Sequence, residues 1–189
     1  RTLNTNLDIN IADMDEDGNI YFVVYGYMNR GTHEGKNGMS LYYYSAENMT
    51  TQELFFVECD ESYDIMKKET GRFTYYNAKT NKFYYLLDET LYEVSLADMT
   101  QTALVEGIPS AKYLVSANRK LAAYPNAAED ENVTAITIQN FETGETYEKT
   151  CANGDLLLAL GFVENDLIYG CSHSADVIMT SDGQAILPL

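Results

Sequence analysis

The chain of 189 residues is long enough to bury one sizeable core, and 46% hydrophobic residues is the content of an ordinary globular protein. Its formal net charge of -17 arises from 29 acidic and 12 basic residues. A protein that binds a polyanion needs clustered lysines and arginines, so this balance argues against nucleic acid and anionic lipid as partners. No apolar run approaches the roughly 20 residues that a membrane helix needs, so we expect no membrane insertion by this segment.

Short runs of aromatic and β-branched residues, separated by turn clusters, dominate the chain and predict strands. The sixteen tyrosines fit half-buried pleated surfaces better than helices. In chain order, the expected strands fall in residues 8–14, 20–27, 40–44, 52–58, 72–77, 82–88, 90–96, 102–106, 112–116, 121–124, 133–139, 145–150, 156–163 and 167–170. A short helix is predicted in residues 61–70, with an irregular loop as the alternative.

These strands fall into successive groups of four. When the second strands are aligned on Ile20, Phe83, Leu121 and Leu167, the spacings are 63, 38 and 46 residues (83 − 20, 121 − 83 and 167 − 121). The last two spacings match the period of roughly 40–50 residues found in propeller blades. We therefore predict an all-β fold of four-stranded antiparallel blades, a β-propeller or partial propeller, with a β-sandwich as the alternative.

The approximate blades are residues 7–60, 61–107, 108–152 and an incomplete 153–189, in a single all-β domain that we expect to be a fragment of a larger chain. Alternate residues of the central strands should be the most buried, because each sheet must cover its faces against its neighbours. This expected core comprises Phe22, Val24, Tyr85, Leu87, Ile136, Ile138, Leu158 and Ile168.

Three cysteines, Cys59, Cys151 and Cys171, lie far apart without the C-x-x-C spacing of a zinc site or redox motif. The odd number leaves at least one thiol free. A disulfide between Cys151 and Cys171 is compatible with their separation, but we expect three buried thiols that behave as small apolar residues. The redox compartment is therefore not fixed by the cysteines.

Three segments carry a resemblance to known proteins. "DEDGNIYFV" resembles the hairpin between the first and second strands of propeller repeats, in which an Asp-Gly turn precedes an apolar strand. "YFVVYGYMNRGTHEG" and "LGFVENDLIYG" are similar to segments of large uncharacterised bacterial cell-envelope proteins. The resemblance covers most of the chain. It implies a blade segment of an extracytoplasmic, cell-envelope protein and assigns no catalytic residue.

Asp13, Asp15, Asp17 and Gly18 match the D-x-D-x-D-G opening of a calcium loop, in which alternate carboxylates converge on a hard cation. The later ligand positions of such a loop fall on apolar residues of the next strand, so the bidentate acid is missing. An Asp-Gly hairpin turn explains the same residues without a metal. We expect a tight turn at residues 15–19 and no cofactor, with calcium as the alternative.

The polar loop after residue 27 supplies Asn29, Arg30, His33 and Glu34 as candidate ligand-binding residues. Long polar connections between second and third strands recur at residues 28–37, 126–132 and 172–182. Such connections leave a propeller on one face, where insertions often mark the binding side. We therefore expect these loops to share one face, with the four residues named above at its most exposed point.

The segment "GCSHSAD" adds His173 and Asp176 as candidate binding residues. It contains the residue types of a Cys-His or Ser-His-Asp site, but adjacent residues of an extended segment point in alternate directions, and no G-x-S-x-G motif is present. No catalytic residue is predicted.

These features favour a non-enzymatic ligand- or protein-binding segment, with a protein or a cell-wall component as partner. An alternative from another class is a hydrolase or lyase with a site on the loop face, using His33 or His173 with an acid such as Glu34 or Asp176. A third is a purely structural propeller arc. A pocket shared by the two histidines would favour the enzyme.

Overall fold

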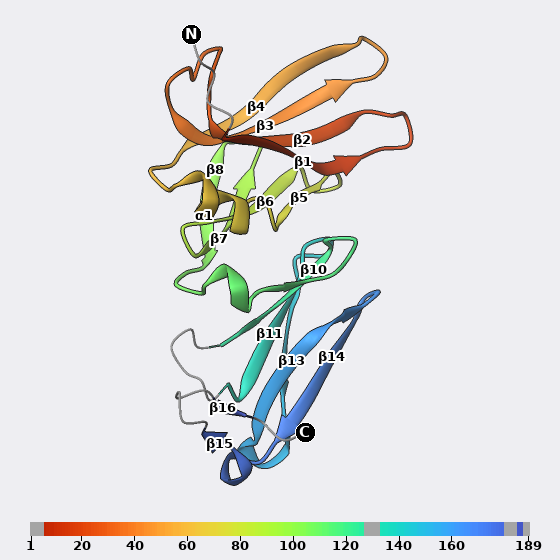
Figure 1. Ribbon diagram of the computed structural model, residues 1–189. Helices are drawn as coiled ribbons and strands as arrows, with labels where there is room; N and C mark the ends of the chain where they lie inside the picture. Colours follow the sequence, from red (N-terminus) through yellow and green to blue (C-terminus); the bar gives the residue numbers. More distant parts are fainter. Residues whose placement is uncertain (1–5, 127–132, 180–184, 187–189) are drawn as a thin grey trace. The chain divides into compact units, whose positions relative to one another are not determined.

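The computed structural model describes residues 6–126, 133–179 and 185–186. The chain divides into two compact units, Arg1–Ser110 and Ala111–Leu189, and each is described by itself (Figure 1). Every described sheet is antiparallel, and within each sheet the strands that pair are consecutive in the sequence.

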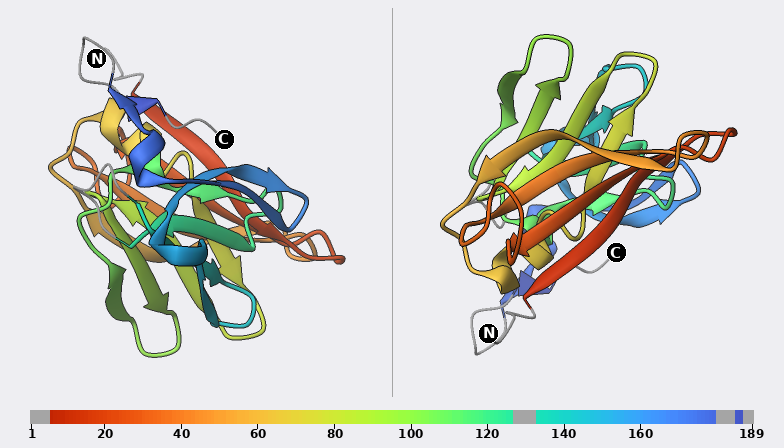
Figure 2. Two further views of the ribbon diagram at one scale, coloured as in Figure 1. Left: turned by 90° about the horizontal axis from the view of Figure 1, so that it is seen from below. Right: turned by 90° about the horizontal axis from the view of Figure 1, so that it is seen from above.

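The first unit holds two four-stranded sheets joined by a short helix. Sheet A comprises β1 (Leu7–Met14), β2 (Ile20–Tyr27), β3 (Asn37–Ser45) and β4 (Thr50–Glu58). Helix α1 (Tyr63–Lys68) follows, and sheet B comprises β5 (Thr74–Asn77), β6 (Lys82–Leu87), β7 (Thr90–Ser95) and β8 (Thr100–Val105). The β1–β2 and β3–β4 hairpins close at the same end of sheet A (Figure 2).

The second unit holds one four-stranded sheet and two smaller ladders. A 3-10 turn, η1 (Ser110–Lys112), leads into sheet C, which comprises β9 (Leu114–Val115), β10 (Leu121–Pro125), β11 (Ala135–Asn140) and β12 (Thr146–Thr150). After η2 (Ala152–Gly154), sheet D pairs β13 (Leu156–Val163) with β14 (Asp166–Ser172). After η3 (Ser174–Asp176), β15 (Ile178–Met179) pairs with β16 (Ala185–Ile186).

The fold class expected from the sequence is confirmed: the chain is all-β and is built from four-stranded antiparallel blades, as in a β-propeller or partial propeller. Sheets A, B and C run in simple sequence order, for example β1-β2-β3-β4. Sandwiches of the immunoglobulin type use Greek-key connections instead, and none joins the described strands.

Helix α1 is also confirmed, within the expected residues 61–70. Ser62 caps its start by accepting a hydrogen bond from the Ile65 backbone N–H, and Met66 is buried beneath it. Asn10 of β1 donates from its side chain to the carbonyls of Thr70 and Gly71, which fixes the chain as it leaves the helix. Among the described residues, no helix has the length and apolar character needed to cross a membrane.

A buried carboxylate holds the β6–β7 hairpin. Asp88 and Glu89 form a two-residue turn in which both have positive φ, 51° and 52°, a conformation that usually requires Gly or Asn. Glu69, only 3% exposed, accepts the backbone N–H groups of Asp88 at 2.6 Å and Glu89 at 2.9 Å. The carboxylate therefore compensates a strained turn and ties it to the end of α1.

Sheets A and B share one aromatic-rich core in the first unit. The strand β2 turns Val23 and Tyr25 toward sheet B, where Phe83 and Tyr85 of β6 are completely buried. The rest of this cluster comprises Ala12, Met39, Leu41, Cys59, Met66, Tyr76, Leu87 and Val94. We call the opposite face of sheet A, which carries Phe22 and Val24, its outer face.

The expected core is correct for Tyr85, Leu87 and Ile136, which are buried. Phe22, Val24 and Ile138 are only half-buried. The prediction is wrong for Leu158 and Ile168, which are 36% and 44% exposed. Both lie in sheet D, whose two strands leave part of their apolar surface uncovered, and a register shift between Ala159 and Gly161 interrupts the alternation of faces.

The core of the second unit is smaller and contains a disulfide. Ala123, Ile136, Cys151 and Leu157 form its buried centre. Cys151 is bonded to Cys171, with 5.9 Å between their Cα atoms, so the expectation of three free thiols is wrong. Only Cys59 is a free cysteine, and it is buried. The cross-link joins the end of β12 to β14. The distance between these two segments along the sequence does not reveal that they lie close together.

Candidate ligand-binding site

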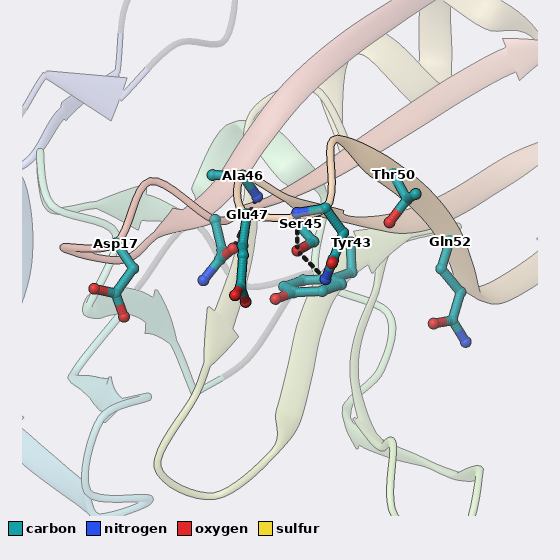
Figure 3. Close-up of a pocket in the computed structure, with 9 residues that line it drawn as sticks. Asp17, Tyr43, Ser45, Ala46, Glu47, Thr50 and Gln52 are labelled. Atoms are coloured by element: carbon teal, nitrogen blue, oxygen red, sulfur yellow. Dashed lines mark hydrogen bonds between the residues drawn. The ribbon is translucent and has the colours of Figure 1, made fainter.

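An open pocket of about 840 Å³ lies at the end of sheet A where its two hairpins close (Figure 3). The β1–β2 turn, the end of β3, the β3–β4 turn and the start of β4 all contribute to it. Its lining comprises Asp17, Asn19, Tyr43, Ser45, Ala46, Glu47, Asn48, Thr50 and Gln52. We call this site the hairpin pocket.

Hydrogen bonds within the turns fix the walls of the hairpin pocket. The Asp15 carboxylate accepts the backbone N–H groups of Asp17 at 3.0 Å and Asn19 at 2.9 Å. Asn19 in turn accepts the Ala46 backbone N–H at 3.0 Å, which links the two hairpins. The Ser45 hydroxyl accepts the backbone and side-chain N–H groups of Asn48. The pocket is thus formed before any ligand arrives.

Tyr43 is the aromatic wall of the pocket. Its ring contacts that of Tyr21, with 4.9 Å between centroids, and Tyr21 stacks on Tyr76 of sheet B at 3.8 Å. This row of rings runs from the core to the pocket and holds the Tyr43 ring in place. Gln52 lies opposite Tyr43 in the β3–β4 register, so both side chains leave the same face of the sheet.

Several polar groups of the pocket have no partner in the described part of the chain: the Tyr43 hydroxyl and the side chains of Asp17, Glu47, Thr50 and Gln52. Carboxylates accept hydrogen bonds, whereas amides and hydroxyls both donate and accept. An aromatic face beside such a set suits a ligand with an apolar surface edged by hydroxyl groups. A carbohydrate has this chemistry.

The calcium candidates Asp13, Asp15 and Asp17 do not converge on one point. Asp13 lies in β1 opposite Tyr21, Asp15 is engaged by the turn, and Asp17 lines the hairpin pocket. Hydrogen bonds, first from the Asn19 side chain and then from the turn backbone, lower the pKa of Asp15. The predicted tight turn is confirmed. In the described ranges, no group of three or more His, Cys, Asp or Glu residues is placed to hold a metal ion.

The β2–β3 loop contains Asn29, Arg30, His33 and Glu34, and only two of them are exposed. Arg30 and Glu34 face solvent, whereas Asn29 is half-buried and donates to the Tyr27 carbonyl at 3.3 Å. His33 packs flat on Phe56 of β4, with ring centroids 3.6 Å apart. The loop therefore packs against β4, which its polar sequence did not indicate.

His33 also belongs to a polar cluster on the outer face of sheet A. Its Nε2 lies 2.7 Å from Glu53 Oε1, while Glu53 Oε2 accepts the hydroxyls of Tyr42 at 2.9 Å and Ser40 at 3.2 Å. Partial burial raises the pKa of Glu53, but these hydrogen bonds and the imidazole charge outweigh it and lower the pKa overall. Sequence reasoning missed Glu53, which is twenty residues from its partner.

His173 pairs with a carboxylate that sequence reasoning also missed. Its Nδ1 lies 2.7 Å from Asp155 Oδ1, and the imidazole is 67% exposed. The hydrogen bond and the charge of Asp155, with a smaller effect of Asp176, raise the pKa of His173. Asp176 is exposed and donates its backbone N–H to the His173 carbonyl. The two histidines belong to different units, and each contacts an acid of its own unit.

The expected common face of the long loops falls partly outside the described residues, at 127–132 and 180–182. In the first unit, the β2–β3 loop and the β6–β7 turn leave the ends of the second strands of their sheets. The hairpin pocket lies at the other end of sheet A, between the connections that join first to second and third to fourth strands. The sequence predicts a binding face at the end of the sheet that carries the β2–β3 loop, and it does not predict this pocket.

Comparison with known proteins gives little further guidance. No family model matches the chain, and no curated protein matches it. Among solved structures, a crystal structure of an oligogalacturonate lyase from Vibrio parahaemolyticus is 13% identical, with a TM-score of 0.31. The match covers 75% of this chain and 46% of that chain, so this chain spans less than half of its length. A similarity this weak supports no argument about fold or activity.

Proposed function

We propose that the protein is a non-enzymatic ligand-binding propeller segment and that it binds a carbohydrate in the hairpin pocket. One observation carries this proposal: Tyr43 and the unpartnered side chains of Asp17, Glu47 and Gln52 surround a single preformed pocket. None of the described residues that line the pocket is basic, so a neutral or amino sugar fits it better than an acidic one. A cell-wall glycan is such a ligand.

Binding is proposed rather than turnover because of the environment of the acids. Glycoside hydrolysis uses two carboxyl groups, one of which is kept protonated by a buried or apolar setting. Asp17 and Glu47 are both exposed. The hydrolase or lyase alternative requires His33 or His173. Neither histidine lines the hairpin pocket, and each pairs with a carboxylate elsewhere.

An extracytoplasmic, cell-envelope location is part of the proposal. The disulfide between Cys151 and Cys171 supports it, because disulfides form and persist mainly in oxidising compartments. The acidic net charge of -17 is compatible with a soluble surface exposed to neutral or cationic polymers.

Calorimetric titration with soluble cell-wall fragments and neutral oligosaccharides tests the proposal. Tyr43→Ala should weaken binding about tenfold or more, which corresponds to ~1.4 kcal/mol, because it removes the aromatic wall. Tyr44→Ala is the matched control, since Tyr44 is the next residue of β3 and points to the other face. Gln52→Ala and its neighbour Thr51→Ala form a second pair. Equal affinities within each pair, or no binding to any glycan, would contradict the proposal.

A further inference from the structure

A second pocket, of about 260 Å³, lies in the first unit at the end of sheet A where β4 finishes, away from the β3–β4 turn. It is enclosed by residues 57–61 and by Tyr85, Leu87, Asp88, Tyr92 and Gln101 of sheet B and its β6–β7 turn. We call it the acidic pocket. It combines two features that a folded protein ordinarily avoids.

The first feature is a concentration of negative charge. Glu58, Asp60, Glu61 and Asp88 line the acidic pocket, and no Lys or Arg is among the lining residues. Lys36 of the β2–β3 loop pairs with Glu58. Within the described residues, Asp60, Glu61 and Asp88 have no basic partner. Like charges gathered without a counter-charge destabilise a compact fold.

These charges act on groups buried behind them. Burial raises the pKa of the Cys59 thiol, and the negative charges of Glu61, Asp88 and Glu69 raise it further. Burial also raises the pKa of Glu69, with Asp88 and Glu61 adding to it. The carboxylates therefore lie close enough to repel one another, so a cation in the pocket would relieve a cost already present.

The second feature is an unpartnered buried hydroxyl. Tyr85 is completely buried, and in the described structure its hydroxyl makes no hydrogen bond. Tyr85 lines the acidic pocket together with Cys59 and Tyr92. The rings of Tyr85 and Tyr92 stack with 5.1 Å between their centroids. A buried polar atom without a partner costs free energy, and such atoms are uncommon in folded proteins. A hydrogen-bond donor that enters the pocket beside Tyr85 would satisfy this oxygen.

We propose that the acidic pocket binds an organic cation, the guanidinium or ammonium head of a small amine or of a basic side chain. The carboxylates supply the charge, the Tyr85 oxygen accepts an N–H, and the rings of Tyr85 and Tyr92 with Leu87 form an apolar wall. A planar guanidinium is weakly hydrated and stacks on aromatic faces, so it suits this wall better than a compact ion does. The carboxylates are not grouped as metal ligands within the described residues.

The size of the pocket limits the ligand to one head group. A volume of about 260 Å³ lies below the roughly 300–1,000 Å³ of pockets that enclose drug-sized molecules. This site is separate from the hairpin pocket, with which it shares no lining residue. The inference therefore stands independently of the carbohydrate proposal.

Calorimetric titration of the full chain with agmatine, and with N-butylurea as its uncharged analogue, tests the inference. Agmatine should bind saturably and the urea should not. Asp88→Asn combined with Glu61→Gln should weaken agmatine binding at least tenfold. Asn is well tolerated at the positive φ of position 88, so this variant should remain folded. Tyr85→Phe, which removes only the orphaned hydroxyl, should weaken binding severalfold without loss of stability.

Glu16→Gln is the control for net charge, because Glu16 is an exposed acid in the β1–β2 turn at the other end of sheet A. It should leave agmatine binding unchanged. The inference is overturned by equal binding of the urea, by equal effects of Glu16→Gln and Asp88→Asn, or by saturable calcium binding without a response to agmatine.

The source of the cation is distinguished by a short neutral peptide with one internal arginine. A peptide affinity at least threefold above that of agmatine indicates that the site takes a basic side chain of a protein partner. A weaker peptide affinity indicates a free amine. Both results require the same Asp88, Glu61 and Tyr85 dependence.

Discussion

The two units hold their sheets together in different ways. In the first, two complete four-stranded sheets bury a core that includes Tyr25, Phe83 and Tyr85. In the second, one complete sheet and a two-stranded ladder bury a small centre around Ile136 and Leu157, and a disulfide supplements it. Large aromatic side chains bury more apolar surface than aliphatic ones. The second unit also buries Tyr113, Tyr124 and Phe141, but it adds a cross-link to its packing, whereas the first unit has packing alone.

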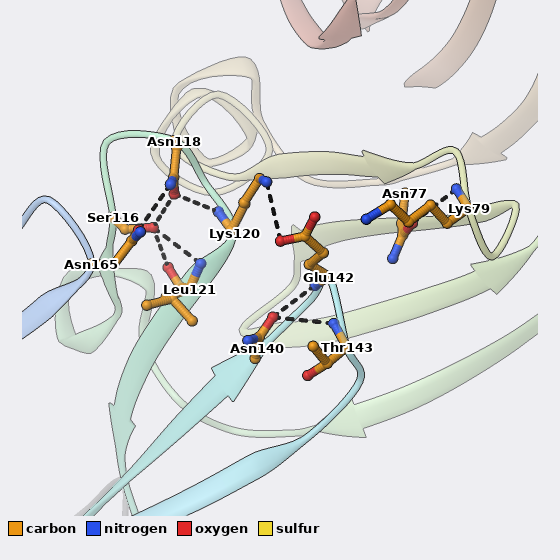
Figure 4. A network of polar contacts seen from close by, with 10 residues as sticks. All are labelled: Asn77, Lys79, Ser116, Asn118, Lys120, Leu121, Asn140, Glu142, Thr143 and Asn165. Atoms are coloured by element: carbon orange, nitrogen blue, oxygen red, sulfur yellow. Dashed lines mark hydrogen bonds and ion pairs between the residues drawn. The ribbon is translucent and has the colours of Figure 1, made fainter. Parts of the chain in front are cut away.

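The two units also differ in how many polar side chains at their hairpin turns have hydrogen-bond partners. In the second unit, turn residues pair with one another: Asn118 bonds to Asn165 at 2.8 Å, and Lys120 bonds to Glu142 at 3.1 Å (Figure 4). At the equivalent end of sheet A, Glu47 and Gln52 remain without partners in the described structure. Asn19 and Ser45 stabilise the turns of sheet A in the same way, but Glu47 and Gln52 remain available to a ligand.

The largest effect is expected from breaking the aromatic core. Phe83→Ala should destabilise the protein by about 3–5 kcal/mol, because the completely buried ring leaves a cavity against Tyr85. Hydrogen exchange followed by mass spectrometry should place the loss of protection in residues 7–105. Loss centred on residues 114–172 would contradict the account that Phe83 stabilises the first unit.

Removal of the cross-link is the converse experiment. Replacement of Cys151 and Cys171 by serine opens a loop with a sequence separation of 20 and should cost about 3 kcal/mol. Exchange should now increase in residues 114–172 and remain low in sheets A and B. Cys59→Ser controls for the loss of a buried sulfur without a cross-link. An unchanged denaturation midpoint would contradict the proposed dependence on the disulfide.

A smaller effect is expected from the Glu69 anchor. Glu69→Ala leaves two turn N–H groups without their acceptor and should cost about 1–3 kcal/mol in chemical denaturation. Burial raises the pKa of Glu69 in the fold, so the folded state favours the protonated acid. The stability that comes from this preference for the protonated acid is complete below about pH 4.3, and it declines as pH rises through the raised pKa. Glu69→Gln should remove that slope, and a slope that persists would argue against Glu69 as its source.

The smallest effect is expected from the His173–Asp155 pair. Its imidazole is largely exposed and its pKa is raised, so the pair stabilises the fold fully below about pH 6.5 and loses this effect as pH rises through the raised pKa. His173→Gln should lower the melting temperature slightly at about pH 5.5 and leave it unchanged at about pH 9. A difference of the same size at both pH values would show that the charge is not involved.

Strands and turns follow from the sequence because turn chemistry and β-forming runs are local signals. The choice of buried face in β2 does not, because Tyr21, Phe22, Val23 and Val24 are all apolar or aromatic, and alternation cannot distinguish two apolar faces. Only the packing of sheet B selects Val23. The same limit explains Leu158, which belongs to an apolar strand on an incomplete sheet.

The candidate site is less predictable because it joins distant turns. The sequence predicts Asp17 as part of a tight turn, with a calcium loop as the alternative, yet Asp17 contributes to a pocket completed by Tyr43 and Gln52. Within the run of tyrosines at 42–44, nothing local indicates which ring faces the pocket. The bond between Asn19 and Ala46, 27 residues apart, brings the hairpins together, and no local pattern encodes it.

The most direct test of the account is a chemical-shift titration of the isotopically labelled protein with a soluble cell-wall oligosaccharide. If the hairpin pocket is the binding site, saturable shifts should concentrate at residues 17–19 and 43–52, and Tyr43→Ala should abolish them while Tyr44→Ala does not. Shifts that concentrate in the β2–β3 loop around Arg30 and His33, or that survive Tyr43→Ala, would contradict it.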